Sequence, residues 1–227
     1  MANTQTSVPA FVASQVLTAQ QQTEINTGIP VFATTVTRDA AFGGAGEKAL
    51  AEGQFAYIEA TNTTQFYDGA AWQSFGGKLG QVVSTNLSST FSTAATAYTD
   101  ITGLSVSITP TAATSKILVL VGLQTSVSAD IAVMFQLVRG STAINIGDAS
   151  GNRTRASFAN LYNDNLFQLG TFNLNFLDSP NTTSATTYKM QMFVNSGTGY
   201  INRTGLDNDA ATRPRTAANI TVMEILV

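Results

Sequence analysis

The chain has 227 residues, of which only 11% are charged, and it contains neither histidine nor cysteine. The missing residues exclude a Ser–His–Asp triad, a catalytic thiol and a disulfide framework, so the composition points away from an enzyme. A net charge of −3 with no basic run is unsuited to nucleic-acid binding. We therefore expect an assembly component, whose Thr, Ser, Asn and Gln side chains form a polar, uncharged surface.

The first 30 residues are predicted to form an extended polar arm that contains a short helix. Thr18 stands three residues before Gln21, which is the capping-box spacing, and Gly28 followed by Pro30 is a stop signal. We expect no signal peptide and no membrane insertion, since no window has about 18 uninterrupted apolar residues. The apolar side chains of the arm are candidates for attachment to a partner: Val8, Pro9, Phe11 and Val12.

Residues 31–77 predict a small α+β module that ends in a β-meander. A strand is expected near residues 31–36, followed by a helical turn with Asp39 near its N-cap. Three short strands follow, with a hairpin turn at Asp68 and Gly69 and the last strand at Trp72. The core of such a module is too small to be robust alone, so we interpret it as an attachment module that needs a neighbour. Gly76 to Gly80 predict a hinge.

Residues 78–227 contain eight or nine strand candidates at the spacing of an antiparallel β-sandwich. Leu104, Val106 and Ile108 alternate with polar residues, which is typical of a strand with one buried face. The segments 117–121 and 131–135 are apolar on both faces, so we expect central strands covered by the opposing sheet and by another subunit. The residues predicted to form this core and a trimer interface are Ile117, Val119, Val121, Ile131, Val133 and Phe135.

The stretch from about residue 196 to 218 is a long connection with few strand signals, and such length favours a functional loop. It combines an aromatic ring with cationic side chains, which is a common design for contact with a glycan or a protein: Tyr200, Arg203, Arg213 and Arg215. The alternative is that the arginines make subunit contacts along a trimer axis. Asp207 and Asp209 have the spacing of calcium ligands, but the Gly and Glu of an EF-hand loop are missing, so no metal site or cofactor is expected.

Several segments resemble a module that is frequent in tail-fibre and minor virion proteins of tailed bacteriophages. The N-terminal segments are residues 31–33 (VFA), 38–41 (RDAA), 52–54 (EGQ), 56–58 (AYI) and 65–72 (QFYDGAAW). Later segments resemble the C-terminal β-domains of the same proteins: residues 98–106 (YTDITGLSV), 115–119 (SKILV), 199–204 (GYINRT) and 220–225 (ITVMEI). The resemblance implies a trimeric virion protein whose N-terminal part attaches to the particle, and it implies no catalytic residue.

We therefore expect a mainly β protein, with the N-terminal attachment module followed by a jelly-roll-like sandwich in residues 78–227. The predicted partners are two further copies of the chain in a homotrimer, other tail or capsid proteins of the virion, and a host surface glycan or protein. Two functions remain open from the sequence. One is a tail-fibre or receptor-binding component, and the other is a capsid decoration or head-fibre protein that stabilises the shell.

Overall fold

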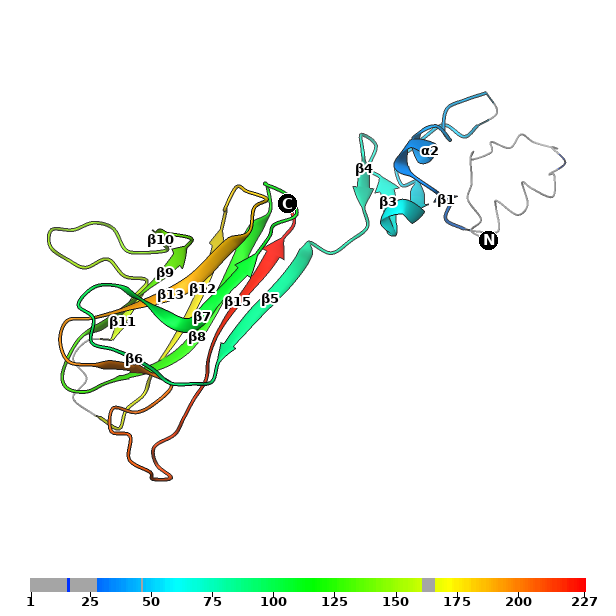
Figure 1. The fold of residues 1–227 in the computed structure, drawn as a ribbon. Helices are drawn as coiled ribbons and strands as arrows, with labels where there is room; N and C mark the ends of the chain where they lie inside the picture. Colours follow the sequence, from blue (N-terminus) through cyan, green and yellow to red (C-terminus); the bar gives the residue numbers. More distant parts are fainter. Residues whose placement is uncertain (1–15, 17–27, 46, 161–165) are drawn as a thin grey trace. The chain divides into compact units, whose positions relative to one another are not determined.

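The computed structural model describes residues 16, 28–45, 47–160 and 166–227. The chain divides into two compact units, residues 1–77 (unit 1) and 78–227 (unit 2). The described residues are mainly strands, and the predicted mainly β fold is confirmed (Figure 1). The attachment candidates Val8, Pro9, Phe11 and Val12 lie outside the described residues, as does most of the predicted arm with its short helix.

Unit 1 is a small four-stranded sheet with one short helix. The sheet order is β1-β2-β3-β4, and β1 is parallel to β2 while the other pairs are antiparallel. The elements are β1 (Val31–Phe32), α2 (Thr35–Asp39), β2 (Phe55–Ile58), the 3-10 helix η1 (Glu59–Thr61), β3 (Thr63–Tyr67) and β4 (Trp72–Ser74). The hairpin between β3 and β4 turns at Asp68, whose carboxylate accepts hydrogen bonds from the backbone N–H groups of Ala70 and Ala71.

The helix α2 begins earlier than the sequence predicts. Asp39 is its last residue, so the expectation that Asp39 caps its N-terminus was wrong. Thr34 is the cap instead, because its hydroxyl accepts from the backbone N–H of Thr37 and the Thr37 hydroxyl accepts from the backbone N–H of Thr34. Two threonines thus make a reciprocal capping box, in which Thr37 takes the place of the usual Glu or Gln.

The core of unit 1 is small. Its fully buried apolar side chains are Phe32, Ala41, Ala56 and Ile58, with Phe42 and Trp72 packed against them. Arg38 is buried beside them, and its guanidinium lies 4.6 Å from the centre of the Trp72 ring. A second aromatic group lies at the surface, where the exposed Phe75 packs edge-on against Phe55 and Phe66.

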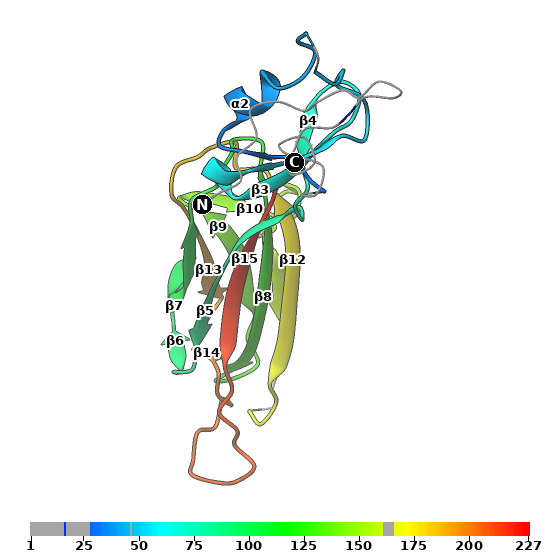
Figure 2. The same cartoon turned by 90° about the vertical axis from the view of Figure 1, so that its right-hand side faces the viewer.

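Unit 2 contains two antiparallel sheets. The first has the order β5-β15-β8-β12, in which β14 continues the line of β15 along β8, and β6 continues the line of β5. Figure 2 shows β15 between β5 and β8, with β12 on the far side of β8. The strands are β5 (Leu79–Leu87), β6 (Phe91–Thr93), β8 (Lys116–Val127), β12 (Gly170–Asp178), β14 (Gly199–Ile201) and β15 (Ala218–Ile225).

The second sheet has the order β7-β13-β9, and the short strands β10 and β11 share the outer edge of β9. Its strands are β7 (Thr99–Ile108), β9 (Val133–Arg139), β10 (Thr142–Ile144), β11 (Phe158–Asn160) and β13 (Thr186–Val194). Strands that lie in one line count as one row, and the rows are numbered here in chain order: β5 with β6 is 1, β7 is 2, β8 is 3, β9 is 4, β10 with β11 is 5, β12 is 6, β13 is 7, and β14 with β15 is 8. In the described part of unit 2 the first sheet then has the order 1-8-3-6, and the second has the order 2-7-4-5. This order, two interleaved Greek keys, is that of a jelly roll.

The core of unit 2 lies between the two sheets and contains the inward-facing side chains of both. Phe158 stacks on both Phe135 and Phe172, with ring centres 4.9 and 4.8 Å apart, and those two rings also contact each other. At one end of the core, the buried carboxylate of Asp178 accepts a hydrogen bond from the Tyr188 hydroxyl at 2.7 Å and forms an ion pair with Arg139 at 2.8 Å. No helix among the described residues is long and apolar enough to span a membrane.

The six residues predicted for the core and trimer interface all lie in this core. Each is at most 4% exposed: Ile117, Val119, Val121, Ile131, Val133 and Phe135. They face the opposing sheet and therefore leave no surface for a second subunit. The prediction that the same side chains also contact another subunit was therefore wrong for this face. Successive side chains of a strand point to opposite faces, so only the alternate residues point outward. On β8 the outward face carries Leu118 and Leu120, which are partly exposed.

Candidate functional site

The long connection at residues 202–217 interrupts one row of the first sheet. Ile201 of β14 pairs with Thr125 of β8, and Asn219 of β15 pairs with Gly122, so the chain leaves the row and then rejoins it further along. The two ends of the connection meet, because the Thr216 backbone N–H donates to the Asn202 carbonyl at 3.2 Å. Residues 202–217, here called the 202–217 loop, are therefore a closed excursion that projects from the sheet, coloured orange to red in Figure 1.

Asn202 holds the base of this loop. Its side chain is fully buried, and its Nδ2 donates to the carbonyls of Leu87 at 2.7 Å and Ser89 at 3.0 Å. Its φ of 63° lies in the left-handed region, which asparagine tolerates better than most residues. No sequence pattern distinguishes Asn202, since the chain is rich in Asn and Thr and has other asparagines in a similar local sequence.

Three charged side chains brace the first half of the loop. Arg203 lies over the Tyr200 ring, with its guanidinium carbon 4.1 Å from the ring centre. The Asp207 carboxylate accepts from Arg215 at 2.7 Å and lies 3.3 Å from Arg203. Arg203 and Asp207 are mostly covered, whereas the Arg215 side chain is 53% exposed. The two arginines therefore fix Asp207, and Arg215 keeps part of its guanidinium open to solvent.

The loop also rests on a neighbouring segment, through one residue from each half. The Arg213 guanidinium lies 4.0 Å from the ring centre of Phe167, and the Leu206 backbone N–H donates to the Leu166 carbonyl at 3.1 Å. Among the described residues, Nε of Arg213 is buried without a hydrogen-bond partner. Each of the two cation–π contacts is worth about 0.5–1 kcal/mol at an exposed site. Together with the Asp207 ion pairs, they hold the loop in one shape.

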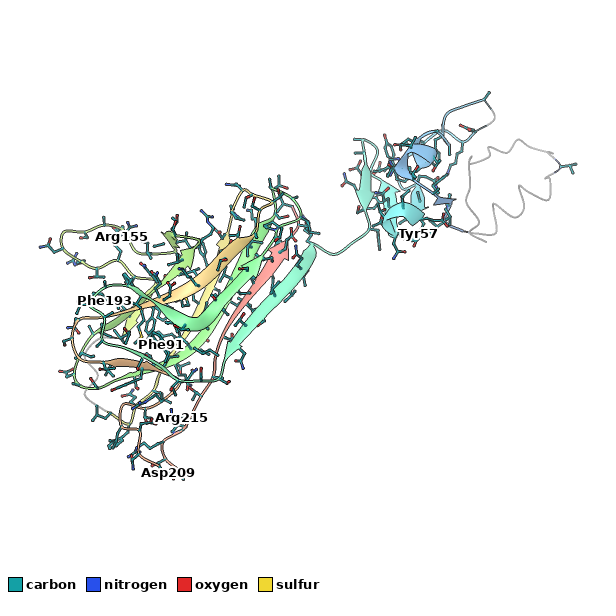
Figure 3. The ribbon with its side chains drawn as sticks, viewed as in Figure 1. Tyr57, Phe91, Arg155, Phe193, Asp209 and Arg215 are labelled. Atoms are coloured by element: carbon teal, nitrogen blue, oxygen red, sulfur yellow. The ribbon has the colours of Figure 1, made fainter. Side chains whose placement is uncertain are left out.

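The loop encloses a polar depression of about 340 Å³, lined by Asp207, Asn208, Asp209, Ala210, Arg213 and Arg215. Figure 3 labels Asp209 and Arg215, which both lie in this projecting loop. Guanidinium, carboxylate and amide groups side by side offer paired donors and acceptors, as sugar hydroxyls and peptide groups require. Asp207 is already paired with two arginines, and the described residues contain no group of three or more Asp or Glu side chains that could hold a metal ion.

The structure thus brings all four predicted contact residues into one region, but in two different positions. Tyr200 belongs to β14, and its ring and Arg203 pack on each other at the base of the loop. Arg213 and Arg215 line the depression itself. Sequence reasoning missed Asp207 as the ion-pair partner and Phe167 as the second ring. Neither carries a local signal, because Phe167 is distant in the chain and Asp207 resembles a turn residue.

Comparisons with known proteins give little similarity. No family model matches the chain, and no curated protein matches it. The solved structures with a weak similarity include the VP2 subviral particle of infectious bursal disease virus, with 14% identity, a TM-score of 0.27, and coverage of 77% of this chain and 47% of that chain. Another is infectious bursal disease virus Gx strain, with 18% identity, a TM-score of 0.26, and coverage of 72% and 46%.

The chain spans about half the length of each of these virus structures. Superpositions with TM-scores this low carry no argument about function or about a shared fold. The jelly-roll assignment of unit 2 rests on its own strand order and registers.

Proposed function

We propose that the protein is a non-enzymatic structural component of a bacteriophage virion, acting as a tail-fibre or receptor-binding protein. Unit 1 with the preceding arm attaches the protein to the particle, and a homotrimer of unit 2 presents the 202–217 loop to the host surface. The single observation that carries the proposal is this loop. A rigid sandwich that holds a braced, projecting, polar loop is the usual arrangement of a binding surface on a scaffold.

The chemistry of the loop favours a polar ligand such as a host glycan or a protein segment. Arg215 and Arg213 present donors, while Asp209 and Asn208 present acceptors around the same depression. Arg203 and Tyr200 support the loop from below, so we assign them a positioning role and assign the contact to Arg215. A braced loop loses little conformational freedom when it binds, which preserves more of the contact energy as affinity.

The test is adsorption of the purified full-length protein to host cells. Arg215→Ala is expected to weaken binding by roughly 10-fold or more, the effect of losing an interface anchor. The matched control is Arg153→Ala, which removes an arginine from a different exposed loop, where its side chain donates to Ser150. Circular dichroism melts of both variants show whether unit 2 stays folded.

Unchanged adsorption of a folded Arg215→Ala protein would refute host contact through this loop. Equal losses in Arg215→Ala and Arg153→Ala would refute it as well, because the effect would then reflect net charge.

The alternative function is a capsid decoration or head-fibre protein that stabilises the shell. The exposed Phe75 and its aromatic neighbours in unit 1 favour a tight attachment, which a shell protein requires as much as a tail protein does. Antibody labelling of intact particles separates the two functions, since label on the tail supports the first and label on the shell supports the second.

A further inference from the structure

The outer face of the β5-β15-β8-β12 sheet carries a row of large apolar side chains. In the strand registers, Met223 of β15 lies between Val82 of β5 and Leu118 of β8. Leu118 in turn lies beside Leu177 of β12. Val82 is 51% exposed and Leu177 is 47% exposed, so the two ends of the row are open. This apolar row crosses all four strands of the sheet.

Polarity increases from this apolar row along the strands. The next row on the same face is Ser84, Thr221, Leu120 and Asn175, and the third is Asn86, Asn219, Gly122 and Asn173. In the third row a Cβ at Gly122 would lie 3.4 Å from both Asn173 Oδ1 and Asn219 Nδ2, so the two amides flank the bare backbone. The face is therefore graded, with an apolar end, a mixed middle and an amide end.

The three rows contain no charged side chain, and Lys116 lies just beyond the apolar end. The outer face of the other sheet is different. There Asp100 forms an ion pair with Lys189 at 2.7 Å and accepts from Gln191 at 2.6 Å, and Gln136 donates to Gln191. The polar groups of that face satisfy one another and suit contact with water. The two outer faces of the sandwich therefore have different roles.

We infer that the graded face of the β5-β15-β8-β12 sheet is the contact between copies of this chain in a homo-oligomer. A charged partner gains nothing from a face without charge, whereas a second copy supplies the same uncharged rows. By strand spacing, the three rows cover roughly 20 by 20 Å, or about 400 Å², and the apolar row makes up about a third of that area. The inference deepens the proposed function, because it rests on the assembly of unit 2 that the proposal includes.

The gradient also determines how the copies are oriented. A rotation axis parallel to the strands keeps every row at its own level, so apolar rows meet apolar rows and amides meet amides. A twofold axis that lies in the contact plane and runs perpendicular to the strands would instead place the apolar row of one copy on the amide row of the other. The copies are therefore parallel, and Leu79, the first residue of β5, lies at the same end of every copy. The chain thus enters unit 2 at one end of the assembly, which suits attachment to a single site on a particle.

The first experiment measures oligomeric mass of the full chain by light scattering at about 10 µM. The wild-type protein is expected at three times the chain mass of 23.8 kDa. Val82→Lys and Leu177→Lys each place a charge in the apolar row at an exposed position, and each is expected to shift the mass to that of one chain. The matched control is Ser105→Lys on the outer face of the other sheet, which is expected to leave the mass unchanged.

Two results would overturn the inference: a wild-type chain that is monomeric at 100 µM, or an oligomer that both Val82→Lys and Leu177→Lys leave intact. Melting temperatures test whether the variants are folded. Both are expected to fold, because Val82 and Leu177 are exposed. A correct oligomer that fails to adsorb to host cells would refute the proposed function and leave this inference standing.

The second experiment tests the direction of packing with single-cysteine variants, because the natural chain has no thiol to compete. Three variants place a cysteine in the apolar row: Val82→Cys, Leu118→Cys and Leu177→Cys. Each is expected to form intermolecular disulfides with itself, or with another of the three when two variants are mixed, because the three positions share a row. A mixture of Leu118→Cys with Asn219→Cys is expected to form no mixed disulfide. A mixed disulfide between those two rows would show a twofold axis in the contact plane, perpendicular to the strands, and overturn the parallel arrangement.

Discussion

Replacing Glu224 with glutamine is expected to destabilise unit 2 in a pH-dependent way. Glu224 faces the core from β15, and none of its surface is exposed. Its carboxylate accepts hydrogen bonds from the Thr111 backbone N–H at 2.6 Å, from the Thr111 hydroxyl at 2.7 Å and from Gln81 at 3.0 Å. Burial by itself would raise the pKa of Glu224, but these hydrogen bonds outweigh it and lower the pKa from 4.5 to about 2.

The magnitude follows from this shift. A pKa lowered from 4.5 to about 2 corresponds to roughly 3 kcal/mol of preference for the ionised form in the folded state. Because its partner Thr111 is exposed, so that solvent screens these hydrogen bonds, we expect about 2 kcal/mol to appear in the free energy of unfolding. The folded-state pKa is depressed, so this contribution is fully present above pH 4.5 and is lost as the pH falls towards 2.

The assay is urea unfolding of the full chain, followed by far-ultraviolet circular dichroism from pH 7 to pH 2. Wild type and Glu224→Gln are expected to differ by about 2 kcal/mol at pH 7 and to converge as the pH approaches 2. Asp148→Asn removes a negative charge at an exposed position of the same unit and serves as the control. A wild-type advantage that is the same at pH 7 and pH 2.5 would refute the role assigned to the ionised carboxylate.

Two further predictions concern the loop base and the small unit. Asn202→Ala leaves the Leu87 and Ser89 carbonyls unpaired and places alanine in a left-handed conformation, so it is expected to cost about 2–3 kcal/mol and to lower adsorption more than Asn202→Gly does once both are folded. Trp72 is the only tryptophan, and it lies in unit 1, so its fluorescence is expected to change at a lower urea concentration than the circular dichroism signal of unit 2. Coincident transitions would show that the two units unfold as one.

The sequence predicts the features of this protein that depend on local pattern. Leu104, Val106 and Ile108 alternate with polar residues, and all three side chains are buried in β7. The apolar segments 117–121 and 131–135 indicate central strands, and β8 and most of the second segment, in β9, do lie between two neighbours in their sheets. Periodicity alone leaves open which alternate set faces inward when both sets are apolar. On β8 both alternate sets are apolar, and only the structure shows that Ile117, Val119 and Val121 face inward and Leu118 and Leu120 outward.

The features that the sequence leaves hidden depend on long-range pairing. That β14 and β15 form one interrupted row follows only from their shared partner β8, and no local pattern encodes it. The same holds for Asn202, which holds the base of the loop because the carbonyls of Leu87 and Ser89 come to lie beside it. The candidate side chains of the 202–217 loop could be chosen from composition, but which of them brace the loop follows only from the positions of Asp207 and Phe167.

Strand β15 links the 202–217 loop to the graded face. It supplies Met223, Thr221 and Asn219 to the face, and its first residues directly follow the loop in the chain. The amide end of the face is thus the end nearest the loop, and the apolar end is nearest Leu79, the first residue of β5. If copies pack in parallel through this face, then all 202–217 loops lie at one end of the assembly, and all β5 strands begin at the other end.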